Sequence, residues 1–142
     1  MKHILAATDG SQGAARGVAA AAALARSTGA TLSIITVGND AIDGRLKPLA
    51  RAEGDVGSAI DLLMNRTLLD ARRIAEQNGV PHVETHTGWG DATETILETA
   101  ARTGADLIVV GRRGRGRLGG LLLGSVSQKI VTLAPCAVLV VP

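Results

Sequence analysis

The chain has 142 residues, of which 46% are hydrophobic but only 1% are aromatic, so we expect one domain over residues 1–142 with a core of Ala, Val, Leu and Ile. The formal net charge is only +2, and the basic excess is local because one loop holds four arginines, which suits a small anion better than a nucleic acid. A single cysteine and the lack of an apolar run of about 18 residues predict a cytoplasmic protein with no internal disulfide and no membrane contact.

The first part of the chain predicts a strand, a helix, a second strand and a long loop. Residues 4–8 are short and apolar, as in a buried strand, and they end at the turn DGS at 9–11. The Ala-rich stretch 14–26 predicts a helix that packs closely on a sheet. Residues 31–37 are β-branched and apolar and predict a strand, whereas 38–57 show no periodicity and indicate a loop or lid.

The rest of the chain predicts helices and strands in alternation. Apolar residues recur at helical spacing from Ile60 to Ile74, and Gly79 closes this helix. Residues 80–87 alternate in polarity and are too polar for the centre of a sheet, so they predict an edge strand. The remaining elements are a helix at 93–101 capped by Asp91, a strand at 107–110, a helix at 126–133 and a last strand at 137–141.

This order of elements predicts an α/β fold. Strands that alternate with helices, and that are mostly apolar on both faces, form a parallel sheet covered by helices on both sides. Right-handed crossovers make such a five-stranded sheet doubly wound, or Rossmann-like.

Two groups of reactive side chains are given structural interpretations. His82, Glu84 and His86 occupy alternate positions of the predicted edge strand, where side chains stand about 7 Å apart, a wide bite for one metal ion. We interpret them as a solvated strand edge. Cys136 has no evident Ser/His/Asp constellation around it and is interpreted as a small buried filler.

The stretch at 111–127, GRRGRGRLGGLLLGSVS, predicts a phosphate-binding loop. Its glycines accept left-handed backbone angles and leave N–H groups facing a ligand. Ser125 stands at the start of a predicted helix, whose N-terminus attracts anions. The four arginines of the loop, at 112, 113, 115 and 117, add positive charge.

Two familiar nucleotide motifs nearly fit this loop but fail. The spacing from Gly119 to Gly124 matches a P-loop, yet Ser125 stands where the P-loop lysine belongs. The residues from Gly114 to Gly119 match GxGxxG, yet no acidic residue follows Asp106 to bind a ribose.

The spacing Gly111-x2-Gly114-x9-Gly124-Ser125, together with the DGS turn, resembles the ATP-binding branch of the universal stress protein family. The resemblance extends over nearly the whole chain through ILAATDGS, ILETA, DLIVVGRRG, LLLGSVSQKI and PCAVLVVP. It implies the strand order 3-2-1-4-5, with a switch point between the first and fourth strands where Asp9 meets the glycine loop. It also implies a homodimer joined through the last strand.

Spacing and charge predict the phosphate-binding residues, which are Gly111, Arg112, Gly114, Gly124, Ser125, Val126 and Ser127. The resemblance implies the nucleoside part of the site, with Ala7, Thr8 and Val37 lining an adenine slot beside Val110. It further implies that Asp9 accepts the ribose hydroxyls or holds Mg²⁺ through water. The competing interpretations are that Asp9, Ser11 or Ser125 only caps a helix, and that the arginines form a solvated face.

These features favour an ATP-binding, nucleotide-responsive regulator of stress physiology that docks on other proteins. One alternative is a slow Mg²⁺-dependent ATPase or phosphotransferase, but there is no P-loop lysine and only Asp9 is placed to position a nucleophile. No catalytic residue is therefore assigned. The other alternative is a module that binds RNA or another anion through the arginines of the loop.

Overall fold

A five-stranded parallel sheet forms the centre of the fold. The computed structural model describes residues 1–38, 56–114 and 122–142. The strands stand in the order β3-β2-β1-β4-β5, and every neighbouring pair is parallel. Their bounds are His3–Ala7 (β1), Thr31–Gly38 (β2), Glu84–Trp89 (β3), Leu107–Gly111 (β4) and Ala137–Val141 (β5). The doubly wound α/β fold and the predicted strand order are confirmed.

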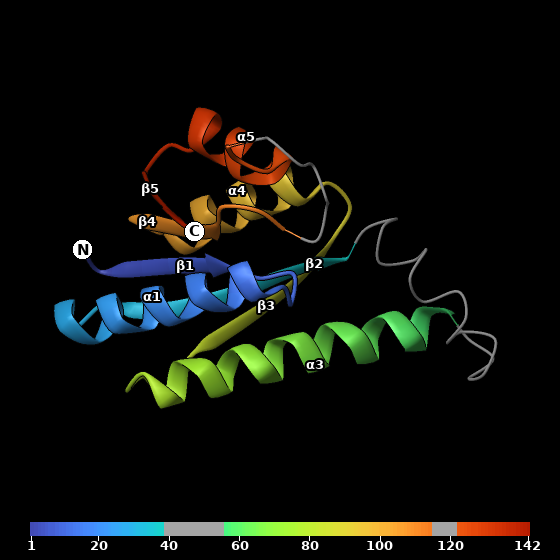
Figure 1. Cartoon of the computed structure of the whole chain (residues 1–142), viewed down its shortest axis with the longest axis horizontal. Coiled ribbons are helices and arrows are strands. Elements are labelled where there is room, and N and C mark those ends of the chain that lie inside the picture. The colour runs from blue at the N-terminus through green and yellow to red at the C-terminus, as the bar shows by residue number, and fades with distance from the viewer. Residues whose placement is uncertain (39–55, 115–121) are drawn as a thin grey trace.

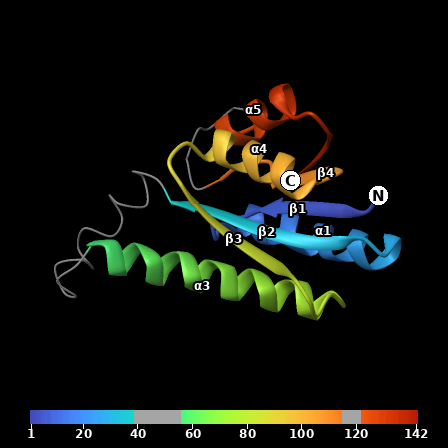
Figure 2. The same ribbon diagram turned by 180° about the vertical axis from the view of Figure 1, so that it is seen from behind.

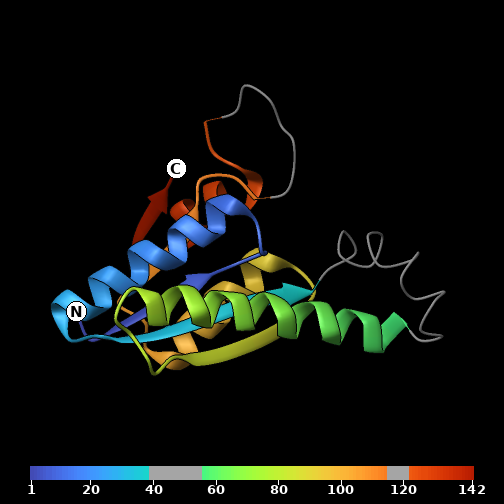
Figure 3. The same cartoon turned by 60° about the horizontal axis from the view of Figure 1, so that its bottom comes forward.

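Helices cover both faces of this sheet. In the described part of the chain they are α1 (Gln12–Thr28), α3 (Val56–Gln77), α4 (Ala92–Thr103) and α5 (Ser125–Leu133). Helices α1 and α3 pack on one face, and α4 and α5 pack on the other (Figures 1 and 2). Figure 3 shows α1 and α3 side by side in front of the sheet.

The first helix begins and ends at residues that the sequence marks. The Ser11 hydroxyl accepts a hydrogen bond from the backbone N–H of Ala14 at 3.2 Å, and Gly29, with φ of 73°, donates its N–H to the carbonyl of Ala25. The buried stripe of α1 consists of small residues, so the helix lies close to the sheet. A Cβ atom on Gly17 would stand 3.5 Å from the backbone nitrogen of Gly111 in β4.

Each face of the sheet carries its own hydrophobic core. Ile4 and Ile34 belong to the core under α1 and α3, and Leu5 and Ile35 belong to the core under α4 and α5. All four are fully buried or nearly so. Because successive strand residues point to opposite faces, burial on both sides requires the near-continuous apolar runs that the sequence contains.

The edge strand β3 differs from the prediction for 80–87. It starts at Glu84, opposite Ser33, and continues to Trp89, opposite Gly38. Pro81 has no N–H to donate to a strand ladder, which favours a late start. The strand extends beyond 87 because β2 itself reaches Gly38 and offers pairing partners that far.

The loop predicted at 38–57 is shorter at both ends. Gly38 is the last residue of β2, and α3 begins at Val56. The remainder of the predicted loop, 39–55, lies outside the described residues. The other elements agree with the sequence prediction in type and order, and the predicted edge positions of the polar strand and of the last strand are confirmed.

Candidate functional site

The turn after β1 is held by side chains from its own sequence. The Thr8 N–H donates to the carbonyl of Ile35 at 2.9 Å, which continues the pairing of β1 with β2 by one residue. The Asp9 Oδ1 atom accepts from the N–H of Ser11 at 2.9 Å, and Gly10 takes a φ of 79°. Ser11 is therefore the cap of α1, and the Asp9 carboxylate braces the turn before it.

The loop after β4 is closed at Arg112. The Arg112 N–H donates to the carbonyl of Val141 at 2.7 Å and so ties the start of the loop to the end of β5. The Arg112 carbonyl accepts from the N–H of Gly124 at 2.8 Å and from the Ser127 hydroxyl at 2.9 Å. One peptide carbonyl therefore holds the returning end of the loop and the first turn of α5.

These two turns meet where the strand order reverses, between β1 and β4. A Cβ atom on Gly114 would stand 2.6 Å from Asp9 Oδ2, and one on Gly111 would stand 2.8 Å from the carbonyl carbon of Gly13. Approaches this close leave no room for a side chain at Gly111. At Gly114 a side chain would fit only if the Asp9 carboxylate moved away. The structure thus brings Asp9 and the beginning of the glycine loop together at the carboxyl ends of the strands, where ligands of open α/β sheets bind.

The prediction that the loop glycines take left-handed backbone angles is wrong at three positions. Gly111 and Gly114 lack a left-handed φ, and Gly124 has a φ of −69°. Gly111 and Gly114 are instead required because a side chain has no room there. A Cβ atom on Gly124 would stand 3.4 Å from the Arg112 carbonyl oxygen, a close contact. The other glycines of the loop, together with Arg115 and Arg117, lie outside the described residues.

The two serines after the loop have different surroundings. Gly124, not Ser125, is the N-cap residue of α5, and it supplies no side-chain cap, so the alternative of Ser125 as the cap is wrong. Ser125 is the first helical residue and is exposed. Ser127 is 3% exposed, and its hydroxyl points to the carbonyls of Arg112 and Gly124. Its side chain therefore joins the loop to the first turn of α5.

The residues expected around an adenine belong to one apolar cluster on the α4 and α5 face. Val37 and Val110 are buried members of that cluster, while Ala7 and Val126 pack against it and are partly exposed. Thr8 is buried at the adjoining strand end. Ala7 and Val126 therefore provide the accessible apolar surface of this group.

Gly13 is a residue of this region that the sequence analysis missed. A Cβ atom there would stand 2.9 Å from the backbone oxygen of Arg113. The signal was a glycine two residues after the Ser11 cap, which by itself only weakens a helix start. Its role depends on a loop about 100 residues further along the chain, which no local pattern reveals.

The polar strand and the cysteine have other surroundings. His82 precedes β3, so His82, Glu84 and His86 do not share one strand face. Within the described residues no group of His, Cys, Asp and Glu is arranged to hold a metal ion.

Cys136 is partly buried and packs against the core under α5, and burial raises the pKa of its thiol. Over the described ranges, no helix combines the length and apolarity needed to span a bilayer.

A doubly wound sheet of five parallel strands, with two tight turns meeting at its switch point, defines a Rossmann-like α/β protein. The family model of the universal stress protein family matches residues 1–142. The chain therefore belongs to the universal stress protein family.

Known proteins of this family resemble the chain over nearly its full length. The universal stress protein in the QAH/OAS sulfhydrylase 3′ region of Thermus aquaticus is 37% identical over 144 residues, which cover 99% of this chain and 98% of the relative. A universal stress protein crystallised in complex with cAMP is 26% identical, with a TM-score of 0.73 and coverage of 99% and 95%. The universal stress protein of Archaeoglobus fulgidus in complex with dAMP has the same fold, with a TM-score of 0.68, coverage of 100% and 98%, and 23% identity.

Proposed function

We propose that the chain binds an adenine nucleotide, ATP together with Mg²⁺, between the turns after β1 and β4, and acts as a nucleotide-responsive regulator of stress physiology. The observation that carries this proposal is the contact of Asp9 with Gly114 at the switch point of the sheet. Family members of the same fold that were crystallised with cAMP or dAMP support the choice of an adenine nucleotide.

The phosphate end of the proposed site is the N-terminus of α5. Since Gly124 contributes no capping side chain, the first N–H groups of the helix, at Ser125 and Val126, are suited to a ligand anion. The positive end of the helix dipole favours negative charge at the same place. Arg112 starts the loop and adds a cationic side chain next to this end.

The nucleoside end of the proposed site is the turn after β1. Asp9 would accept the ribose hydroxyls or hold Mg²⁺ through water, and the base would lie on the apolar group that includes Ala7 and Val37. A bound Mg²⁺ would offset the repulsion between the Asp9 carboxylate and the phosphates. Asp9 fits this role because its Oδ2 atom faces the start of the glycine loop while Oδ1 holds the turn.

Calorimetric titration with ATP, in the presence and absence of Mg²⁺, tests the proposal. We expect saturable binding at micromolar to millimolar ATP that is stronger with Mg²⁺. Asp9→Asn should weaken binding and reduce the effect of Mg²⁺, whereas Glu98→Gln, an exposed position on α4, should leave both unchanged. Absence of heat and of competition by any adenine nucleotide up to millimolar concentration would reject the proposal.

We also propose that two copies of the chain associate through β5. This strand pairs only with β4 in the described sheet, and Ala137 and Leu139 on it are exposed. An apolar strand edge without charged residues readily pairs with a second edge. Sedimentation should show a dimer that Leu139→Lys shifts toward the monomer, whereas Leu62→Lys, at a leucine on α3 that is more exposed than Leu139, should not. A monomer for the unchanged chain at micromolar concentration contradicts this part.

A further inference from the structure

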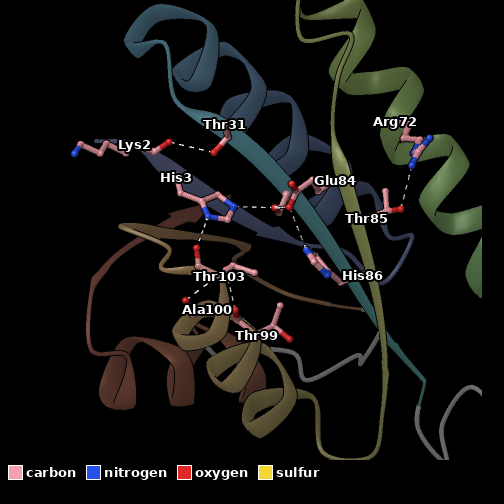
Figure 4. Close-up of polar contacts among 11 residues, drawn as sticks. Lys2, His3, Thr31, Arg72, Glu84, Thr85, His86, Thr99, Ala100 and Thr103 are labelled. Atoms are coloured by element: carbon pink, nitrogen blue, oxygen red, sulfur yellow. Dashed lines mark hydrogen bonds and ion pairs between the residues drawn. The ribbon is translucent and has the colours of Figure 1, made fainter.

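Four polar side chains from three adjacent strands meet on the α4 face of the sheet, near the amino ends of the strands. They are His3 of β1, Ser33 of β2, and Glu84 and His86 of β3, and we call them the two-histidine cluster. Ser33 lies opposite Glu84 in the strand register. Figure 4 shows His3, Glu84 and His86 turned toward one another beside the end of α4. The cluster lies away from the turns after β1 and β4, which are at the carboxyl ends of the strands.

The hydrogen bonds of His3 determine where its proton is. Its Nδ1 atom lies 2.8 Å from the carbonyl oxygen of Thr103, at the end of α4. A carbonyl only accepts, so Nδ1 carries a hydrogen. In the neutral ring Nε2 is then an acceptor, and it receives the hydroxyl hydrogen of Ser33 at 2.7 Å.

Protonation of His3 reverses this last bond. The charged ring has a hydrogen on Nε2 as well, so Nε2 donates to the Ser33 oxygen instead of accepting from it. The single hydroxyl hydrogen of Ser33 is then released. Its other neighbour is Glu84, whose Oε2 atom lies 3.4 Å from the Ser33 oxygen, and the hydroxyl donates there.

His86 lies near the same carboxylate oxygen, Glu84 Oε2. Its Nε2 atom is buried, has no hydrogen-bond partner, and lies 3.9 Å from Glu84 Oε2. Burial lowers the pKa of His86 below its ordinary value of 6.5, and the Arg102 guanidinium on α4 lowers it further. The Glu84 carboxylate acts in the opposite direction, and His3 adds a smaller lowering effect. Asp106, which directly precedes β4, accepts from the backbone N–H of His3 at 2.9 Å.

We propose that the two-histidine cluster is a proton-operated switch on the edge strand β3. When His3 gains a proton, the hydroxyl of Ser33 turns to Glu84 and competes there with His86. When His86 gains a proton, burial disfavours its charge, and with Glu84 engaged by Ser33 the charged ring favours a position nearer water, which loosens β3 from β2. Acidification therefore weakens the attachment of an edge that neutral pH keeps closed.

The position of β3 makes it the element that responds. It is paired with β2 from Glu84 to Trp89 but has no second neighbouring strand in the described sheet. On the α3 side Arg72 donates to the Thr85 hydroxyl at 3.2 Å, and on the α4 side Gly88 lies against Thr95. Neither contact involves a histidine.

Nuclear magnetic resonance of the unchanged chain gives the first test. The chain has three histidines, so three ring signals can be followed, and the exposed His82 serves as an internal reference. At neutral pH the nitrogen shifts of His3 should identify the form protonated at Nδ1. A His3 ring protonated at Nε2 would overturn the proposal, because Ser33 would then have no bond to reverse.

The Ser33→Ala variant tests the coupling. Where His3 is protonated, the Ser33 hydroxyl occupies Glu84, and without that hydroxyl Glu84 is left to His86, so the titration midpoint of His86 should rise by on the order of half a pH unit. If the His86 midpoint stays the same, the hydroxyl does not compete for Glu84 and the switch is refuted. Should the variant fail to fold, the ring-proton test on the unchanged chain still decides.

Hydrogen exchange tests the consequence for the strand. Opening of β3 restores the ordinary pKa of His86, so protons favour the open form. Protection of β3 amides, corrected for intrinsic rates, should be complete above about pH 6.5 and then fall, by at most about tenfold per pH unit for one linked proton. The protection of β4 amides should not change over this pH range. His86→Gln should remove the pH dependence of protection in β3. Equal behaviour of β3 and β4 across this range would exclude the switch.

Discussion

The hydroxyl group of Ser127 and the carbonyl oxygen of Arg112, 15 residues apart in the chain, are joined by a hydrogen bond of 2.9 Å. The same carbonyl also accepts the N–H of Gly124. The bond from Ser127 therefore attaches the first turn of α5 to the start of the glycine loop.

Replacing Ser127 by Ala should lower the free energy of unfolding by about 1 kcal/mol, the usual net contribution of one such hydrogen bond. ATP binding should weaken as well, because the loop loses one of its two attachments at Arg112. Urea denaturation and calorimetry measure the two effects. Ser125→Ala is the control, since Ser125 is exposed and its loss should change stability by less than about 0.5 kcal/mol. Equal stability losses in both variants would contradict this assignment.

Replacing Gly111 by Ala should destabilise the fold by about 1 to 3 kcal/mol, because the new Cβ meets backbone atoms of Gly13 and Ala14 at 2.8 to 3.0 Å. The partner position Gly17 provides the contrast. A Cβ there makes ordinary contacts from 3.5 Å outward, and alanine favours a helix interior over glycine by about 0.5 to 1 kcal/mol. Thermal unfolding should therefore show a lower Tm for Gly111→Ala and an unchanged or higher Tm for Gly17→Ala.

Replacing Gly114 by Ala should affect the ligand more than the fold. The new Cβ meets the Oδ2 atom of Asp9 at 2.6 Å, and a carboxylate can rotate away where backbone cannot. We expect a small loss of stability but a clear loss of ATP affinity, because Asp9 is moved. Gly104→Ala should do the opposite and lower stability without changing ATP affinity, because its φ of 68° strains an alanine at a position far from the proposed site. Full ATP affinity in Gly114→Ala would argue against the role proposed for Asp9.

The Asp106 carboxylate should make folding sensitive to acid. It accepts from the backbone N–H groups of Lys2 and His3 at 2.7 and 2.9 Å, and these bonds lower the pKa of Asp106 below its ordinary value of 3.8. A carboxyl whose pKa is lower in the folded chain contributes stability above 3.8 that is lost as the pH falls through the folded pKa. Asp106→Asn should therefore flatten the dependence of Tm on pH below about 4, while Glu98→Gln controls for net charge.

Gly38 and Trp89 allow a spectroscopic prediction. A Cβ on Gly38 would overlap the Trp89 ring, which is already half exposed, so Gly38→Ala should force the ring further toward water. Trp89 is the only tryptophan of the chain, and its fluorescence emission should shift to longer wavelength. An unchanged emission maximum would mean that the backbone moves instead of the ring.

The alternation of apolar strands with amphipathic helices predicted the doubly wound sheet, and this is a local signal, because strand periodicity, caps and turns depend on neighbouring residues. The order of the strands, and with it the meeting of the turns at Asp9 and Gly111, was implied only by the resemblance to the universal stress protein family. The polarity of residues 80–87 likewise placed that strand at an edge. The start of β3 at Glu84 was missed because it depends on which residue of β2 lies opposite.

Only the tertiary structure decided how the side chains at these places are used. The hydroxyl of Ser127, a residue predicted to bind phosphate, is directed to the Arg112 carbonyl, and Gly111 and Gly114 are needed for space rather than for left-handed angles. His3 received no role from the sequence, yet it bonds to residues 30 and 100 positions away. The order and register of the strands bring such residues together, and a pattern read along one stretch of chain carries no information about contacts that the packing of distant stretches creates.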